Sequence, residues 1–170
     1  MFGFYENFPE NIHYTESFTC SVSRKSMQQK IIKVFHEMNL STFTFEEIGS
    51  PAVHQSSIIF EFGVAEAGNF IFLNETETKK VLDALDRRTL QVMDLFCAIR
   101  YYKNQQSKKT PLRFDYYMMR MVFGKEKSVE LQVFHDRGPR YISPEELVTF
   151  LSRKINGSTA RKILTPIESV

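Results

Sequence analysis

Two segments of the chain, residues 57–85 and residues 116–155, show the same order of patterns. Each contains two strand-like apolar runs joined by a short turn, and each continues into a helix cap and an amphipathic helix. Two such runs around a short turn predict an antiparallel hairpin. The segments share no residue identity beyond this pattern. Plain alternation of strands and helices and an internal pseudo-repeat therefore both remain open.

Outside these segments, the sequence predicts two more strands and one more helix. Residues 11–22 and 42–48 alternate between apolar and polar side chains, which predicts strands. From Ser23 to Met38 the apolar residues recur at intervals of three and four, which predicts an amphipathic helix with a basic outer face.

Two further helices are predicted from their caps. The longest begins after Asn74, with Glu77 three positions on. Its apolar stripe consists of Val81, Leu82, Leu85, Met93, Phe96 and Ile99, with room for a break near residues 86–89. A polar, basic loop is expected over residues 101–111. The last helix is capped by Ser143, with Pro144 and Glu146 in its first turn and Gly157 at its end.

These patterns predict an α+β fold with an antiparallel sheet of about six to seven strands, packed with one long and two shorter amphipathic helices. The length of 170 residues fits one domain. We expect this domain to span residues 1–157 and the C-terminal tail, residues 158–170, to be flexible.

Composition indicates an ordinary globular protein, with 42% apolar and 25% charged residues. The longest apolar runs are far shorter than the roughly 18 residues of a membrane span, and the N-terminus lacks the pattern of a signal peptide. Cys20 and Cys97 stand far apart, which argues against a disulfide framework. We expect an intracellular protein, in the cytoplasm or in the nucleus or nucleoid, that has no membrane partner.

The common catalytic and metal-binding motifs are missing from the sequence. None of the four histidines has another at helical ligand spacing, and no phosphate loop, GxGxxG or GxSxG motif occurs. His135 precedes Asp136, but neighbours in a strand point to opposite faces, so His135 is predicted to be a strand-end residue with a satisfied hydrogen bond. We predict no catalytic residue, no metal and no cofactor, which makes an enzyme the less favoured class.

Charge is distributed unevenly along the chain. Residues 1–85 contain 6 Lys and Arg against 11 Asp and Glu, whereas residues 86–170 contain 16 against 9. Such an asymmetry indicates either a polyanionic partner or self-association through opposite charges.

Basic residues are interleaved with aromatic ones in the C-terminal half. In a strand over residues 112–123, Arg120 shares one face with Phe114, Tyr116, Met118 and Val122, and one of the two faces must be core. Cations beside exposed rings suit single-stranded nucleic acid, because cations neutralise phosphates and rings stack on unpaired bases. The candidate nucleic-acid-binding residues are Arg113, Arg120, Phe123, Lys125, Lys127, Arg137, Arg140, Lys108, Lys109 and Tyr117.

Residues 118–155 also resemble a known unit. The run MMRMVFGK, the strand VELQVF and the segment GPRYISPEEL are similar to the strand, Gly-Lys turn, strand and capped helix of positive-cofactor-type transcriptional coactivators and, more loosely, of Whirly proteins. The resemblance implies binding of single-stranded DNA on a curved antiparallel sheet by dimers or higher assemblies. It would put Arg120, Phe123, Lys125 and Lys127 on the binding hairpin and pack the helix after Ser143 against the sheet or a partner.

Three functional hypotheses follow from the sequence. The first is a non-enzymatic protein that binds nucleic acid, preferably single-stranded DNA or RNA, through its C-terminal half. The second is a homo-oligomeric interaction scaffold, a dimer or higher, in which acidic and basic halves of neighbouring copies meet. The third is a small-ligand binder or enzyme with a pocket in a curved sheet.

Overall fold

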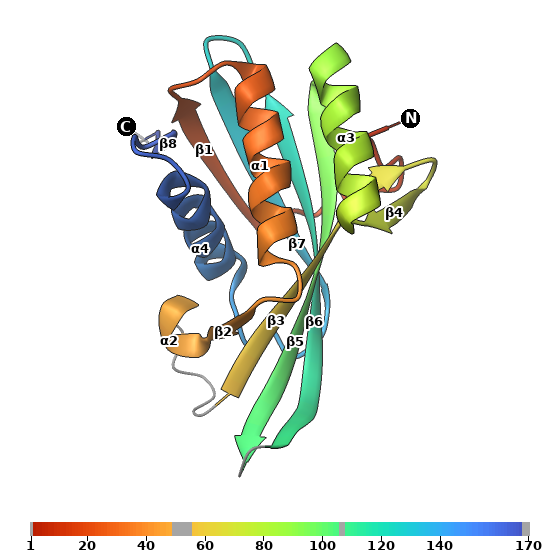
Figure 1. The fold of residues 1–170 in the computed structure, drawn as a ribbon, viewed down its shortest axis with the longest axis vertical. Helices are drawn as coiled ribbons and strands as arrows, with labels where there is room; N and C mark the ends of the chain where they lie inside the picture. The colour runs from red at the N-terminus through yellow and green to blue at the C-terminus, as the bar shows by residue number, and fades with distance from the viewer. Residues whose placement is uncertain (1, 49–55, 106–107, 168–170) are drawn as a thin grey trace.

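A computed structural model describes residues 2–48, 56–105 and 108–167, apart from the side chains of residues 104–112. The described residues form eight strands and four helices, and all pairings between these strands are antiparallel (Figure 1). The predicted α+β class and antiparallel sheet are therefore confirmed. In chain order the elements are β1 (Tyr14–Cys20), α1 (Arg24–Met38), β2 (Thr42–Thr44), α2 (Phe45–Ile48), β3 (Ser56–Glu66), β4 (Asn69–Phe72), α3 (Glu75–Arg87), β5 (Val92–Gln105), β6 (Lys108–Phe123), β7 (Ser128–Arg137), α4 (Pro144–Gly157) and β8 (Leu164–Pro166).

The sheet has the strand order β2-β3-β5-β6-β7-β1-β8, and β4 pairs with the end of β3. Helices α1, α3 and α4 lie on one face of this sheet (Figure 1). The lower ends of β3, β5 and β6 extend beyond the helices in this view. Among the described residues, the opposite face is covered by no helix, which leaves part of the sheet surface open.

The core lies between the helices and the sheet. Phe35 of α1 stacks on Phe62 of β3, with 4.3 Å between the ring centroids. Burial of one such ring contributes about 1.5–3 kcal/mol to folding. The central strands send alternate side chains into this core: Met93, Leu95, Cys97, Ile99 and Tyr101 from β5, and Tyr117, Met119, Met121 and Phe123 from β6.

The predicted helix caps at Asn74 and Ser143 are confirmed, and the structure adds a cap at Ser23. The Asn74 side-chain oxygen accepts a hydrogen bond from the Glu77 backbone N–H at the start of α3. The Ser23 hydroxyl accepts a hydrogen bond from the Ser26 backbone N–H, and α1 begins at the next residue after the cap. Ser143 and Glu146 form a reciprocal capping box at the start of α4. Each cap satisfies backbone N–H groups that lack a partner within the helix, and so fixes where the helix begins.

The prediction that the long helix continues to Ile99 was wrong. Helix α3 ends at Arg87, and residues 92–105 form strand β5. Met93, Phe96 and Ile99 fit a helical interval of three, but the apolar side chains that are fully buried are those of alternate residues from Met93 to Tyr101. Pairing with β3 on one side and β6 on the other favours the strand. The segment predicted as a loop, residues 101–111, includes the ends of β5 and β6.

Part of the segment predicted as a C-terminal tail pairs with the sheet. Strand β8 pairs with β1, and both Ile163 and Leu164 are buried. The Asn156 side chain accepts hydrogen bonds from the backbone N–H groups of both residues, at 2.9 and 2.8 Å. The fold therefore extends past residue 157 to the end of β8. Residues 168–170 lie outside the described part of the chain.

The two segments singled out in the sequence both fold as a hairpin followed by a helix. Residues 57–85 cover β4 and most of β3 and α3, and residues 116–155 cover β7, the second half of β6 and most of α4. Plain alternation of strands and helices and an internal pseudo-repeat both fit this arrangement. The turn between β6 and β7 takes its left-handed conformation at Glu126 and Lys127, with φ of 58° and 56°, rather than at the preceding Gly124.

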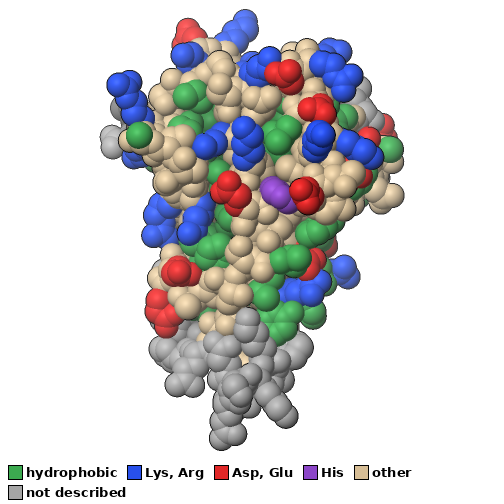
Figure 2. All heavy atoms as spheres, in the orientation of Figure 1, with side chains coloured by type: hydrophobic (Ala, Val, Ile, Leu, Met, Phe, Trp, Pro, Cys, Tyr) green, Lys and Arg blue, Asp and Glu red, His purple; other side chains and the backbone are tan. Residues whose placement is uncertain are grey.

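The charge asymmetry along the sequence does not divide the molecule into two faces. Strand β1, from the acidic half, lies between β7 and β8, and β3 pairs with β5. Figure 2 shows basic and acidic side chains interspersed over the helix-covered face. This arrangement therefore does not favour the predicted self-association, in which the acidic half of one copy meets the basic half of another.

Candidate functional site

The face of the sheet opposite the helices carries three rows of side chains that lie directly across neighbouring strands. In one row Phe96 is opposite Gly63 and Met118, and in the next Ala98 is opposite Glu61 and Tyr116. In the third, Arg100 lies between Ile59 and Phe114. We name this surface the open sheet face; its members are Ile59, Glu61, Phe70, Phe72, Phe96, Ala98, Arg100, Phe114, Tyr116, Met118, Phe134 and Arg137.

The N-terminal segment covers the part of the same face next to these rows. The Gly3 N–H donates to the Ala65 carbonyl, and the Gly3 carbonyl accepts from the Asp94 N–H, both at 2.7 Å. Arg120 forms an ion pair with the buried Asp94 carboxylate. Its guanidinium also lies over the rings of Phe4 and Phe8, 5.0 and 4.4 Å from their centroids. Arg120, predicted as a nucleic-acid contact, is therefore occupied in holding this segment on the sheet.

A continuous row of aromatic rings runs from the N-terminal segment across the open sheet face. Tyr5 and Phe70 are 4.7 Å apart between centroids, Phe70 and Phe96 are 5.5 Å apart, and Phe96 and Tyr116 are 5.8 Å apart. Phe114 ends the row, 6.2 Å from Tyr116 and nearly parallel to it. Phe114 is 41% exposed, so at least this end of the row is accessible from solvent.

Two arginines flank the exposed end of the row. The Arg137 guanidinium lies 4.5 Å from the Tyr116 ring centroid, and the Arg100 guanidinium lies 5.8 Å from that of Phe114. Arg100 is paired with Glu61. A hydrogen bond with Tyr102 and, to a smaller extent, the charge of Glu61 raise the pKa of the Arg100 side chain. Arg137 makes a looser pair with Asp136, at 3.8 Å. Both cations are partly exposed and can exchange these carboxylates for another anion.

Two of the predicted binding residues are part of the core instead. Tyr117 and Phe123 point to the helix-covered side and are at most 6% exposed. The Tyr117 hydroxyl donates to the Ile142 carbonyl, and burial raises the pKa of this phenol well above its ordinary value. Their rings cannot stack on an external base, because alternation along β6 gives the open face to their neighbours. For these residues the sequence-based prediction was wrong.

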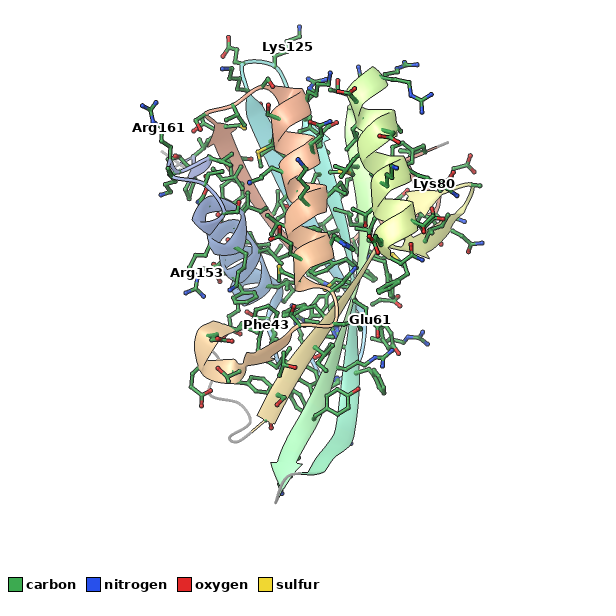
Figure 3. All side chains as sticks on the ribbon, viewed as in Figure 1. Phe43, Glu61, Lys80, Lys125, Arg153 and Arg161 are labelled. Atoms are coloured by element: carbon green, nitrogen blue, oxygen red, sulfur yellow. The ribbon has the colours of Figure 1, made fainter. Side chains whose placement is uncertain are left out.

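The predicted lysines do not gather at one place. Lys125 and Lys127 are exposed at the turn between β6 and β7, and Figure 3 shows Lys125 at the end of the molecule away from Glu61. Lys108 and Lys109 begin β6 at its other end, and their side chains lie outside the described ones. With 16 residues, β6 spans about 50 Å between these ends.

The three remaining predicted residues divide between surfaces. Arg137 lies on the open sheet face beside Tyr116. Arg113 pairs with Tyr101 in the sheet register and is exposed on the opposite face, while Arg140 is exposed in the loop before α4. Sequence reasoning missed Phe96 and Arg100, because the segment up to Ile99 was predicted as a helix and residues 101–111 as a loop. Their alternation with the buried Leu95, Cys97 and Ile99 is the signal that could have found them.

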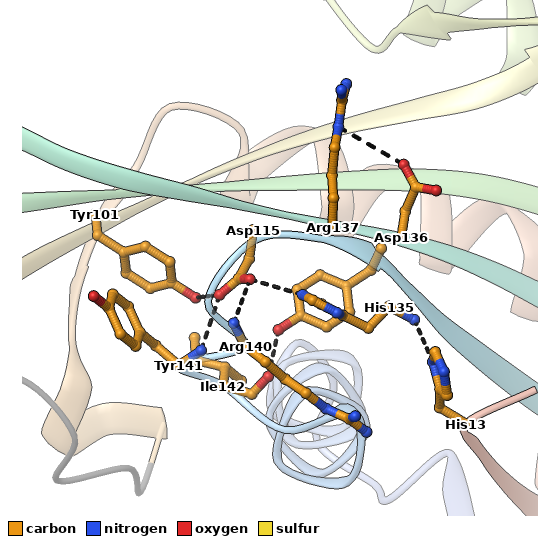
Figure 4. Close-up of polar contacts among 10 residues, drawn as sticks. His13, Tyr101, Asp115, His135, Asp136, Arg137, Arg140, Tyr141 and Ile142 are labelled. Atoms are coloured by element: carbon orange, nitrogen blue, oxygen red, sulfur yellow. Dashed lines mark hydrogen bonds and ion pairs between the residues drawn. The ribbon is translucent and has the colours of Figure 1, made fainter.

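A second polar cluster surrounds the fully buried Asp115 carboxylate (Figure 4). This carboxylate accepts from the Tyr101 hydroxyl at 2.5 Å and from the backbone N–H groups of Arg140 and Tyr141 at 2.7 and 3.0 Å. His135 Nε2 is 2.8 Å from it, which confirms the predicted hydrogen bond of this histidine. Asp136, the sequence neighbour, is not the partner.

The Asp115 cluster holds the loop that precedes α4. Its donors come from β5, β7 and that loop, so one carboxylate ties three parts of the chain together. Burial raises the pKa of Tyr101, which keeps the hydroxyl protonated and able to donate. Burial also raises the pKa of the nearby Cys97 thiol and so keeps it un-ionised and poorly nucleophilic. We therefore assign this cluster a structural role.

Within the described residues, no group of three or more potential metal-ligating side chains occurs, and no helix has the length and apolar character needed to span a membrane. His54 lies outside the described part of the chain. Comparison of the chain with models of protein families, with curated proteins and with solved structures finds no match.

Proposed function

We propose that this protein binds single-stranded nucleic acid on the open sheet face. The observation that carries the proposal is the row of rings from Phe70 through Phe96 and Tyr116 to Phe114, flanked by Arg100 and Arg137. The resemblance of residues 118–155 to single-stranded DNA-binding proteins points to the same class of ligand, although the interface proposed lies mainly on other residues.

The chemistry of such a surface favours unpaired bases. Stacking of a base on an aromatic side chain contributes about 1–3 kcal/mol, and open antiparallel sheets that bear such rings stack two or three bases. Phe114 and Tyr116 are the first rings available to a base. A duplex keeps its base faces stacked on one another, so it cannot make this contact. The preference for single strands follows from that difference.

The arginines supply the contacts to phosphate. Arg100 and Arg137 already lie against rings, so a base stacked there would bring its phosphates close to both guanidinium groups. Phosphate would replace Glu61 as the partner of Arg100 and Asp136 as the partner of Arg137. Binding of phosphate replaces two existing ion pairs and adds no further ones. We therefore expect modest affinity for the oligonucleotide and an affinity that decreases only slightly as the salt concentration rises.

The direct test is fluorescence anisotropy with a labelled oligothymidylate of about 12 nucleotides. We expect binding that weakens between about 50 and 200 mM salt, and weaker binding of the matching duplex. The double substitution F114A/Y116A should reduce the binding free energy by about 1–3 kcal/mol per ring. The matched control is L40A, which removes an apolar side chain that is 60% exposed but lies in the turn after α1.

Two results would reject the proposal. One is the absence of binding at tens of micromolar protein in low salt. The other is equal loss of affinity in F114A/Y116A and L40A, because this would show that the rings have no special part. Circular dichroism of each variant separates loss of the interface from loss of the fold.

Self-association is a second candidate function of the same face. Phe72 and Phe114, both on the open sheet face, are 38% and 41% exposed, and large exposed rings are typical of protein interfaces. A stable dimer needs about 800 Å² buried on each copy. Sedimentation equilibrium with and without oligonucleotide distinguishes the two candidates. A dimer that forms through this face should be weakened by F72A/F114A and dissociated by a bound strand.

A further inference from the structure

A separate cavity of about 230 Å³ lies where the end of β1, the start of α1 and the turn between β6 and β7 meet. Its apolar walls include Val22, Met27, Phe123 and Val129. It lies at the end of the molecule marked by Lys125 in Figure 3 and does not include any residue of the open sheet face. The cavity is therefore separate from the proposed nucleic-acid interface.

The described residues around this cavity carry more positive than negative charge. Arg24, Lys125 and Lys127 line it together with one carboxylate, that of Glu126. Arg24 is fixed in place, because its Nη2 donates to the carbonyl oxygens of Phe123 and Gly124 at 3.3 and 3.1 Å. The first turn of α1 contributes no acidic residue, although carboxylates are favoured there. An anion would relieve this imbalance.

The apolar walls continue deeper into the fold. A second void, of about 20 Å³, lies between α1, α4 and the sheet, and Met27 and Val129 line both spaces. Methionine side chains adapt to what they pack against, so movement of Met27 could join the two spaces. The Cys20 thiol lies beside the larger cavity, and burial raises its pKa, so it adds no competing negative charge.

The structure assigns to this cavity a small amphipathic carboxylate, with its alkyl chain along Val22, Met27 and Val129 and its head group at Lys125, Lys127 and Arg24. The volume is below the roughly 300–1,000 Å³ of pockets for drug-sized ligands. It has room for about eight groups of the size of a water molecule. A linear fatty acid of medium length, such as octanoate, meets both the size and the charge.

Calorimetric titration with sodium octanoate, sodium butyrate, octan-1-ol and inorganic phosphate tests the proposal. We expect octanoate to bind best, with affinity that increases roughly fourfold for each methylene added to the chain. Octan-1-ol, which has no charge, should bind more weakly and without dependence on salt. If butyrate or phosphate bound as tightly as octanoate, the proposed contact of an alkyl chain with the apolar walls would be wrong. If octan-1-ol bound as tightly as octanoate, the proposed contact of a carboxylate with the basic residues would be wrong.

The location of binding is tested by two kinds of variant. V22F fills the cavity and should abolish octanoate binding. K125Q/K127Q should weaken binding about two- to fivefold for each lysine, whereas the control K33Q, which changes an exposed lysine of α1, should not. Equal effects of K125Q/K127Q and K33Q would overturn the assignment.

A second measurement keeps the test independent of how V22F folds. Methyl NMR spectra of the unmodified protein should show octanoate-dependent shifts of Val22, Met27 and Val129. The methyl signals of Ile59, on the open sheet face, should not move. Shifts confined to other methyl groups would reject this cavity as the site, and they would leave the nucleic-acid proposal unaffected.

Discussion

The carboxylate of Asp94 on β5 accepts two hydrogen bonds from the guanidinium of Arg120 on β6, at 2.7 and 2.8 Å. The two residues are directly opposite in the sheet, and Asp94 is fully buried. The same carboxylate accepts from the Tyr5 N–H at 2.7 Å. One ion pair therefore joins the two central strands and also binds the N-terminal segment.

We predict that R120A lowers the free energy of unfolding by about 3 kcal/mol, because it leaves a buried carboxylate without its charged partner. Urea denaturation measures this change. R100Q is the control: it removes an arginine from an exposed pair with Glu61 and should cost less than about 1 kcal/mol. Similar losses in both variants would contradict the structural role given to Arg120.

A second prediction concerns the Asp115 cluster. Y101F removes one of the hydrogen bonds to a buried carboxylate without changing the packing of the ring. Hydrogen bonds to charged groups contribute about 1.5–3 kcal/mol, and we expect Y101F to lower the free energy of unfolding by that amount. The measurement is again urea denaturation, and a change below about 0.5 kcal/mol would be incompatible with this bond.

Gly138 should tolerate no side chain. Its φ is 113°, and an added Cβ would lie 2.3 Å from the Phe114 carbonyl oxygen and 2.4 Å from Asp115 Oδ1. G138A should therefore destabilise the fold by more than about 2 kcal/mol, since strain and displacement of the cluster add together. G157A is the matched control, because a Cβ there meets nothing within 4 Å. It should leave the melting temperature unchanged or raise it slightly.

The fourth prediction is a dependence of stability on pH that originates at His13. Burial lowers the pKa of His13 below 6.5, and the positive charges of Arg140 and His135 act in the same direction. Its Nδ1 accepts from the His135 backbone N–H at 2.8 Å, a bond that protonation of Nδ1 would break. The folded state therefore binds the proton more weakly than the unfolded state does.

The lowered pKa of His13 makes the folded state less stable at low pH. Stability contributed by neutral His13 is fully present above pH 6.5 and is lost as the pH falls from there through the lowered pKa of the folded state. In H13N the amide oxygen can accept the same hydrogen bond but does not titrate. Melting temperatures measured from pH 8 to pH 5 should therefore fall further for the unmodified protein than for H13N. Parallel curves would contradict the prediction.

Local patterns in the sequence were sufficient for most of the helices and hairpins. The caps at Asn74 and Ser143 determine where α3 and α4 begin, because the bonds that form them are made within three residues. The hairpin of β6 and β7 follows from two alternating runs around a short turn. These features depend on neighbours in the chain, which is why they could be predicted without the fold.

Residues 92–105 and the binding surface could not be predicted in this way. Met93, Phe96 and Ile99 fit a helical stripe as well as a strand, and pairing with β3 and β6 decided in favour of the strand. Which side of β6 is open depends on where the helices pack, so Tyr117 became core and Tyr116 became surface. Likewise, the charges of the two halves were mixed when β1 paired with β7.

The sequence by itself thus determined the α+β class, the helix caps and the hairpins, because these depend on local hydrogen bonds and on the period of apolar residues. Only the tertiary structure decided which rings meet on the open sheet face, that Arg120 is neutralised by Asp94, and that Arg24 lies beside the turn that carries Lys125. These contacts join residues far apart in the chain, and the packing of the helices on one side of the sheet brings them about.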